Sequence, residues 1–163
     1  MEDREIAVEV ARSYIGTPYR WGGDDPIEGF DCSGLTGEAL TSANRLQRGF
    51  DTTAMGLYRI FEDVWVWRRK KPTGSFDKSG LEVLAGCLVF FGESLDKISH
   101  VEMLMDEEHT IGASGGGRTT ISLEAAVKAN AFIKIRPLFS RKDVLAIVDP
   151  FQHPRVYTAL NLL

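Results

Sequence analysis

A cysteine at the predicted start of a helix is the first residue in this sequence with the chemistry of a catalyst. Cys32 lies between Asp31 and Ser33 in "GFDCSGL", after turn-forming residues from Gly22 to Gly29. Asp31 suits the N-cap of a helix running from Cys32 to about Ala43, which places the thiol in the first turn. Unpaired backbone N–H groups and the helix dipole favour thiolate over thiol there. The N–H of Cys32 is also free to donate to a developing oxyanion, so the position suits a nucleophile.

A cysteine at this position could also be a buried apolar residue, half of a disulfide or a metal ligand instead of a nucleophile. The chain has only one other cysteine, Cys87, and neither belongs to a CxxC pair. A disulfide framework and a four-cysteine zinc site are therefore excluded, although a single bridge stays open. We expect no metal site and no cofactor.

A nucleophilic cysteine needs a base, and the chain offers three histidines. His100 opens the predicted strand "HVEMLM", where a rigid element can hold the ring against a residue on a packed helix. His109 follows an acidic turn and His153 precedes Pro154 in the tail, and both positions are typical of exposed histidines. His100 alone fits an ordinary strand-edge residue equally well. The pairing with Cys32 is what favours catalysis.

The elements that must position these residues form an α+β pattern. Apolar residues at helical spacing predict a helix over Glu5–Tyr14, and Asp51 to Thr53 can cap a short helix through Phe61. Gly74 to Gly80 is typical of a loop. The second half has one further helix, over Ser122–Asn130, and strand-like runs predicted to form an antiparallel meander, with "VWVWRRK" as a half-buried strand before them. These later runs are "CLVFF", "HVEMLM", "HTIGAS", "FIKIRP" and "KDVLAIVDP".

The bulk properties predict one domain over residues 1–163. The net charge of −4 argues against nucleic acid as the main partner. No run of apolar residues is long enough to span a membrane, and the acidic N-terminus lacks the pattern of a secretory signal, so we expect synthesis in the cytoplasm. Residues 151–163 form an apolar tail, which we expect to pack on the body or to meet a partner, including a second copy of the chain.

Five segments together resemble the NlpC/P60 family of papain-like cysteine peptidases in their order and spacing. The resemblance implies a papain-like fold, with N-terminal helices packed on a central antiparallel sheet. It implies Cys32 as nucleophile and His100 as general base, with Tyr19 near the oxyanion and Asp31 and Ser33 shaping the subsite for the amino-terminal part of the substrate. The segments are "GTPYRWGG", "GFDCSGL", "LAGCLVFF", "SHVEMLM" and "TIGASGGG".

The resemblance also implies a reaction. Family members typically cut the amide bond between D-γ-glutamyl and the diamino acid of bacterial cell-wall stem peptides, through a thioester acyl-enzyme. Peptidoglycan stem peptides are therefore the expected substrate. A non-catalytic structural module, for instance in phage tail assembly, and a related amidase or acyltransferase are the alternatives. A phage or prophage origin would make the protein virion-associated or released by lysis.

Three residues depart from the family pattern. The third polar residue, usually a histidine twelve residues after the catalytic one, is replaced by Gly112. Three alternatives follow. The enzyme works as a Cys–His dyad, or the His100 ring is held by a substitute such as His109, a backbone carbonyl or a water, or activity is reduced. Cys87 stands where the family has aspartate and suits a buried packing residue. Glu102 stands where the family has glycine, and we expect it either to alter the cleft wall or to face solvent.

Overall fold

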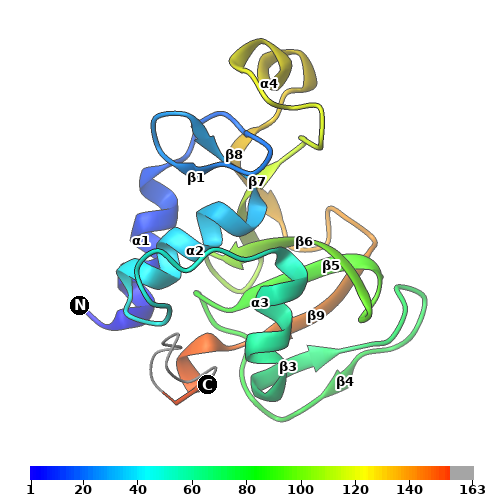
Figure 1. The fold of residues 1–163 in the computed structure, drawn as a ribbon. Helices are drawn as coiled ribbons and strands as arrows, with labels where there is room; N and C mark the ends of the chain where they lie inside the picture. Colours follow the sequence, from blue (N-terminus) through cyan, green and yellow to red (C-terminus); the bar gives the residue numbers. More distant parts are fainter. Residues whose placement is uncertain (155–163) are drawn as a thin grey trace.

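One large antiparallel sheet organises the chain in this computed structural model, which describes residues 1–154. Seven strands lie in the order β4-β3-β9-β5-β6-β7-β8, and every neighbouring pair is antiparallel (Figure 1). The meander expected from the sequence is confirmed by the succession β5-β6-β7-β8. The strands are β3 Trp65–Arg68, β4 Asp77–Lys78, β5 Leu88–Ser94, β6 Lys97–Leu104, β7 His109–Ser114, β8 Phe132–Pro137 and β9 Val144–Val148.

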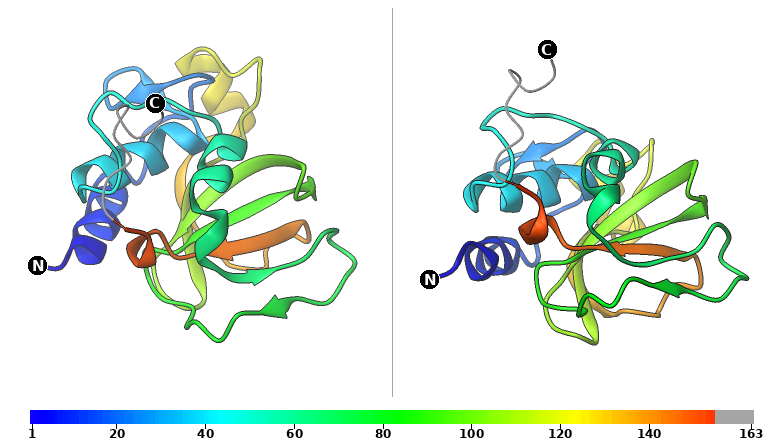
Figure 2. Two further views of the ribbon diagram at one scale, coloured as in Figure 1. Left: turned by 60° about the horizontal axis from the view of Figure 1, so that its bottom comes forward. Right: turned by 90° about the horizontal axis from the view of Figure 1, so that it is seen from below.

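Three helices precede the sheet in the sequence and pack on one side of it (Figure 2). Helix α1 spans Asp3–Ser13, α2 spans Cys32–Ser42 and α3 spans Ala54–Phe61. Helices α2 and α3 both contact β6, and α1 packs mainly on α2. Helix α4, Leu123–Ala129, lies between β7 and β8 in the chain, beyond the end of the sheet in Figure 1. The predicted α+β class, with N-terminal helices on an antiparallel sheet, is confirmed.

Both faces of the central strands are buried, which explains the continuous apolar run "CLVFF". Leu88 and Phe90 belong to the core cluster beneath the helices, whereas Val89 and Phe91 belong to a second cluster on the opposite face. Because side chains alternate along a strand, a strand covered on both faces must be apolar at every position. Cys87 is fully buried in the second cluster, as its sequence context predicted.

Short elements refine the sequence expectations. The turn-rich segment before Cys32 contains a two-stranded hairpin, β1 Asp24–Asp25 and β2 Gly29–Phe30. The predicted loop at Gly74 to Gly80 contains strand β4, and single 3-10 turns occupy Glu62–Val64 and Pro150–Gln152. Strand β9, the last strand within residues 1–154, enters between β3 and β5. The sheet order therefore differs from the chain order.

The predicted C-terminal tail is described only at its beginning. The Phe151 ring lies 4.7 Å from the guanidinium carbon of Arg4 and 5.2 Å from that of Arg45, so the tail starts packed on the body. Residues 155–163 lie outside the described residues, and the expectation that they meet a partner stays a prediction. Within residues 1–154, no helix has the length and apolar character needed to cross a membrane.

Candidate active site

Asp31 determines where helix α2 begins. Its Oδ1 accepts the backbone N–H of Gly34 at 2.7 Å and the Ser33 hydroxyl at 3.2 Å, and its Oδ2 accepts the N–H of Gly22 at 3.1 Å. The predicted N-cap is therefore confirmed, and the same carboxylate ties the helix to the preceding turn. A Cβ on Gly34 would lie 2.1 Å from the carbonyl oxygen of Gly23, so only glycine permits this close approach. The result is a fixed first turn with Cys32 in it.

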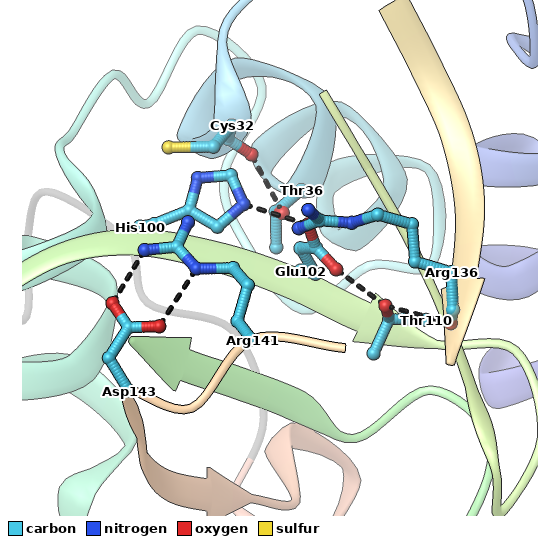
Figure 3. Close-up of polar contacts among 8 residues, drawn as sticks. All are labelled: Cys32, Thr36, His100, Glu102, Thr110, Arg136, Arg141 and Asp143. Atoms are coloured by element: carbon cyan, nitrogen blue, oxygen red, sulfur yellow. Dashed lines mark hydrogen bonds and ion pairs between the residues drawn. The ribbon is translucent and has the colours of Figure 1, made fainter. Parts of the chain in front are cut away.

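His100 reaches the same point from strand β6. Its Nε2 lies 2.8 Å from Oε1 of Glu102, and Figure 3 shows the other ring nitrogen, Nδ1, turned toward the Cys32 side chain. The His100 ring is also packed against Phe91, with ring centroids 5.4 Å apart. The structure thus brings Cys32 and His100 together, as the sequence predicted, and holds the histidine from two sides.

Glu102 is the centre of a buried polar network that sequence reasoning missed. Its side chain is 1% exposed, so the alternative that it faces solvent is wrong. Oε1 accepts from Arg136 of β8 as well as contacting His100, and Oε2 accepts the Thr110 hydroxyl of β7 at 2.5 Å. Burial alone would raise the pKa of Glu102, but His100, Arg136 and Thr110 together lower it. The carboxylate therefore remains ionised inside the protein.

The neighbours of His100 favour its protonated form. Burial alone would lower the pKa of His100, but hydrogen bonding and charge from Cys32 and Glu102 outweigh that effect and raise it. An imidazolium between a thiolate and a carboxylate is stabilised from both sides. The arrangement can therefore hold the ion pair from which a thiol nucleophile attacks.

A cavity of about 740 Å³ opens onto these residues. Tyr19, Asp31, Ser33, Cys32 and His100 all line it, so the five residues implied by the resemblance are in one place. Burial, followed by the charges of Cys32 and Asp31, raises the pKa of Tyr19, so its hydroxyl stays protonated. Tyr19 is consequently available as a hydrogen-bond donor in the cavity.

His109 lies elsewhere, which corrects the suggestion that it substitutes for the third residue. Its Nδ1 is 3.0 Å from Oδ1 of Asp106, within the acidic turn. Its carbonyl accepts from the N–H of Met105, five positions beyond His100 along the chain. The partner of the His100 ring is Glu102.

Residues 16–136, most of the chain, match the model of the NlpC/P60 family. The chain belongs to the NlpC/P60 family. Among curated proteins it is 30% identical to the bifunctional muramidase/DL-endopeptidase CwlT of Bacillus subtilis, over 72% of this chain and 31% of that protein. It is 31% identical to the gamma-DL-glutamyl hydrolase of the same organism, over 71% of this chain and 24% of that protein. The chain thus spans about a third or less of either relative.

A solved structure shows the same fold. The NlpC/p60 domain of the peptidoglycan hydrolase SagA superposes with a TM-score of 0.58 at 25% identity, covering 90% of this chain and 97% of that one. The papain-like NlpC/P60 architecture expected from the five motifs is therefore confirmed.

Two departures from the NlpC/P60 pattern prove to be one structural feature. The β6–β7 register pairs Met103 with Ile111 and Leu104 with Thr110, and its continuation sets Glu102 opposite Gly112. Glu102 fills the room left by the missing side chain and reaches the His100 ring. The sequence alone indicates that Glu102 lies on the same face of the strand as His100, because residues two apart in a strand share a face. That Glu102 contacts the His100 ring can be predicted only when the missing side chain at Gly112, on the neighbouring strand, is taken into account.

The second cysteine plays no part in this site. Both cysteines are free, so the single bridge left open by the sequence is not formed. Cys87 is fully buried on the opposite face of the sheet, and burial, followed by the charge of Asp149, raises its pKa to about 11. It is an unreactive packing residue.

Proposed function

We propose that the protein is a cysteine endopeptidase that hydrolyses the amide bond between D-γ-glutamyl and the diamino acid of bacterial cell-wall stem peptides. The observation that carries the proposal is that Cys32 and His100 border one open cavity, while the buried Glu102 holds the His100 ring from within the protein. The names of the two Bacillus relatives, a DL-endopeptidase and a gamma-DL-glutamyl hydrolase, support this substrate class.

The first half of the reaction forms an acyl-enzyme. His100 holds the proton of Cys32, and the thiolate attacks the carbonyl carbon of the scissile amide. The developing oxyanion accepts the backbone N–H of Cys32, in the first turn of α2, and the hydroxyl of Tyr19. The tetrahedral intermediate collapses as His100 donates its proton to the amide nitrogen. The C–N bond breaks, an amine leaves and a thioester remains on Cys32.

The second half releases the acid. Neutral His100 takes a proton from water, and the resulting hydroxide attacks the thioester carbonyl. Collapse of the second intermediate breaks the C–S bond and frees the carboxylic acid. The sulfur leaves as the thiolate, paired again with the imidazolium, so the site returns to its starting state.

Glu102 is a positioning residue in this scheme. It fixes the ring so that Nε2–H points at the carboxylate and Nδ1 is left for the thiol, and its charge stabilises each imidazolium that forms. Arg136 and Thr110 hold the carboxylate in turn. The histidine is therefore oriented although residue 112 has no side chain.

The proposal is tested by incubating the protein with purified muropeptides under reducing conditions and identifying the fragments by mass spectrometry. Wild type and the control Cys87→Ala should release fragments with a new glutamyl carboxylate, whereas Cys32→Ala should release none. Equal release by Cys32→Ala, or none by the wild type across several pH values, would overturn the proposal. The second outcome favours the non-catalytic alternative.

Products joined to an added amine would instead identify the acyltransferase alternative. Association with a phage virion, or release by lysis, stays a prediction.

A further inference from the structure

A permanently charged side chain, that of Arg141, borders the candidate active-site cavity. Arg141, in the loop between β8 and β9, is the only arginine or lysine among the described residues that border it. The carboxylates that border the cavity, Asp31 and Asp51, come from the segments before α2 and α3. The cavity wall is thus electrically asymmetric, and an asymmetric wall can orient a charged substrate.

Arg141 is held in place rather than free in solvent. Its Nε and Nη2 donate to the two carboxylate oxygens of Asp143 at 2.8 and 2.6 Å, and its guanidinium carbon lies 4.9 Å from the ring centroid of Phe91. Phe91 pairs with His100 across β5 and β6, so Arg141 is anchored to the strands that carry the candidate base. An arginine fixed in this way loses little conformational freedom when it binds a ligand.

The anchoring leaves one edge of the guanidinium available. Because Nε and Nη2 face Asp143, the remaining nitrogen, Nη1, is directed away from that carboxylate. No hydrogen bond joins Nη1 to any residue within 1–154. The side chain is 31% exposed, and Figure 3 shows the guanidinium beside the His100 ring, with Asp143 on its far side. The free edge is therefore presented next to the candidate base.

The position beside His100 determines which part of a substrate Arg141 meets. In the proposed reaction the leaving amine must lie within reach of His100, because it takes its proton from that ring. Asp31, by contrast, is the N-cap residue at the start of α2. A group beside His100 therefore meets the residue that is released as the amine.

We propose that Arg141 binds a carboxylate on the leaving-group residue and selects diamino acids that carry a second carboxylate. This inference rests on the proposed peptidase function. Diaminopimelate has a side-chain carboxylate and lysine lacks one, so the Nη1 edge of Arg141 distinguishes the two. A hydrogen-bonded arginine–carboxylate contact supplies both affinity and orientation.

Three synthetic peptides that differ at a single group test the inference. All have the sequence L-alanyl-γ-D-glutamyl-X-D-alanine, where X is meso-diaminopimelate, its side-chain amide or L-lysine. The enzymes are the wild type, Arg141→Gln, Arg141→Lys and the control Arg12→Gln, which changes an exposed arginine of α1. The readout is kcat/KM for each enzyme on each peptide, with circular dichroism to verify folding.

The wild type and Arg12→Gln should prefer the carboxylate peptide. Arg141→Gln should lower kcat/KM on that peptide by about 10- to 100-fold, the cost of losing a charged hydrogen bond, and leave the other two unchanged. Arg141→Lys should retain part of the preference for the carboxylate peptide, because lysine keeps the positive charge but lacks the planar set of N–H donors of a guanidinium. An equal loss on all three peptides, or no preference in the wild type, would overturn the inference alone. Failure of the wild type to cleave any peptide would overturn the peptidase function as well.

Discussion

Glu102 occupies the space that a side chain at residue 112 would need. A Cβ built on Gly112 would lie 2.4 Å from Cγ and 2.7 Å from Cδ of Glu102, closer than atoms that are not bonded can approach. The partner of the histidine therefore comes from the histidine's own strand, two residues on, instead of from the neighbouring strand. The glycine is a requirement of this arrangement, because any larger residue at this position would meet the Glu102 side chain.

The coupling predicts that changes at these two positions are not additive. Gly112→His alone should destabilise the protein by about 1–3 kcal/mol, because the new side chain meets buried atoms, and should abolish activity. Glu102→Gly with Gly112→His removes the clash and offers a histidine at the usual position. Denaturant unfolding and peptidase assays on both single variants and the double variant should give a coupling energy of about 1–3 kcal/mol. Strictly additive changes would show that the two positions are independent.

Neutralising Glu102 should impair catalysis without removing the nucleophile. Glu102→Gln keeps the size of the side chain and one acceptor for the His100 ring, but loses the charge that stabilises the imidazolium. We expect kcat/KM to fall by about 10- to 100-fold, since a hydrogen bond to a charged group is worth about 1.5–3 kcal/mol. Because the pKa of His100 should fall as well, the pH profile of kcat/KM should shift, which a purely structural role would not produce.

Glu107→Gln, at an exposed position in the acidic turn, is the matched control. Unchanged kinetics and an unchanged profile in Glu102→Gln would contradict the positioning role.

Local signals in the sequence predict much of this site without reference to the family pattern. Asp31 as N-cap, Cys32 in the first turn and His100 on a strand all follow from local signals, and all are confirmed. The relation between Glu102 and Gly112 does not follow from local signals, because the contact depends on the register between β6 and β7.

Arg141 was missed for a different reason. It lies forty-one residues after His100 in a loop between β8 and β9, and no local pattern places a loop against a cavity. The insertion of β9 between β3 and β5 likewise depends on packing of the whole sheet. Local propensity indicates the elements, and only tertiary structure indicates which of them meet.

The ion pair between His100 and Glu102 should make stability depend on pH in two directions. The pKa of His100 is raised in the folded protein, so its contribution is complete below the unfolded value of about 6.5 and is lost as pH rises through the folded pKa. The pKa of Glu102 is lowered, so its contribution is present above the unfolded value of about 4.3 and is lost as pH falls through the folded pKa. The other titratable groups that act on this pair are Cys32, Arg136 and Asp143, and the Thr110 hydroxyl donates a hydrogen bond to Glu102.

The free energy of unfolding of the wild type, minus that of Glu102→Gln, should therefore be largest between about pH 4.3 and 6.5. Urea titrations at several pH values measure this difference directly. A difference that stays constant from pH 3 to 9 would mean that the pair does not titrate as the structure predicts.

The two cysteines should differ in reactivity by orders of magnitude. Cys32 borders an open cavity next to His100, so a small reagent can reach it and the histidine can accept its proton. Cys87 is fully buried, and its pKa of about 11 leaves on the order of one thiolate in ten thousand at pH 7. Iodoacetamide followed by peptide mass mapping should therefore label Cys32 first, and His100→Ala should slow that labelling while leaving Cys87 unlabelled in the folded protein. Labelling in denaturant provides the control, because both cysteines are then exposed and should react at similar rates. Faster labelling of Cys87 in the native protein would contradict the assignment of Cys32 as the nucleophile.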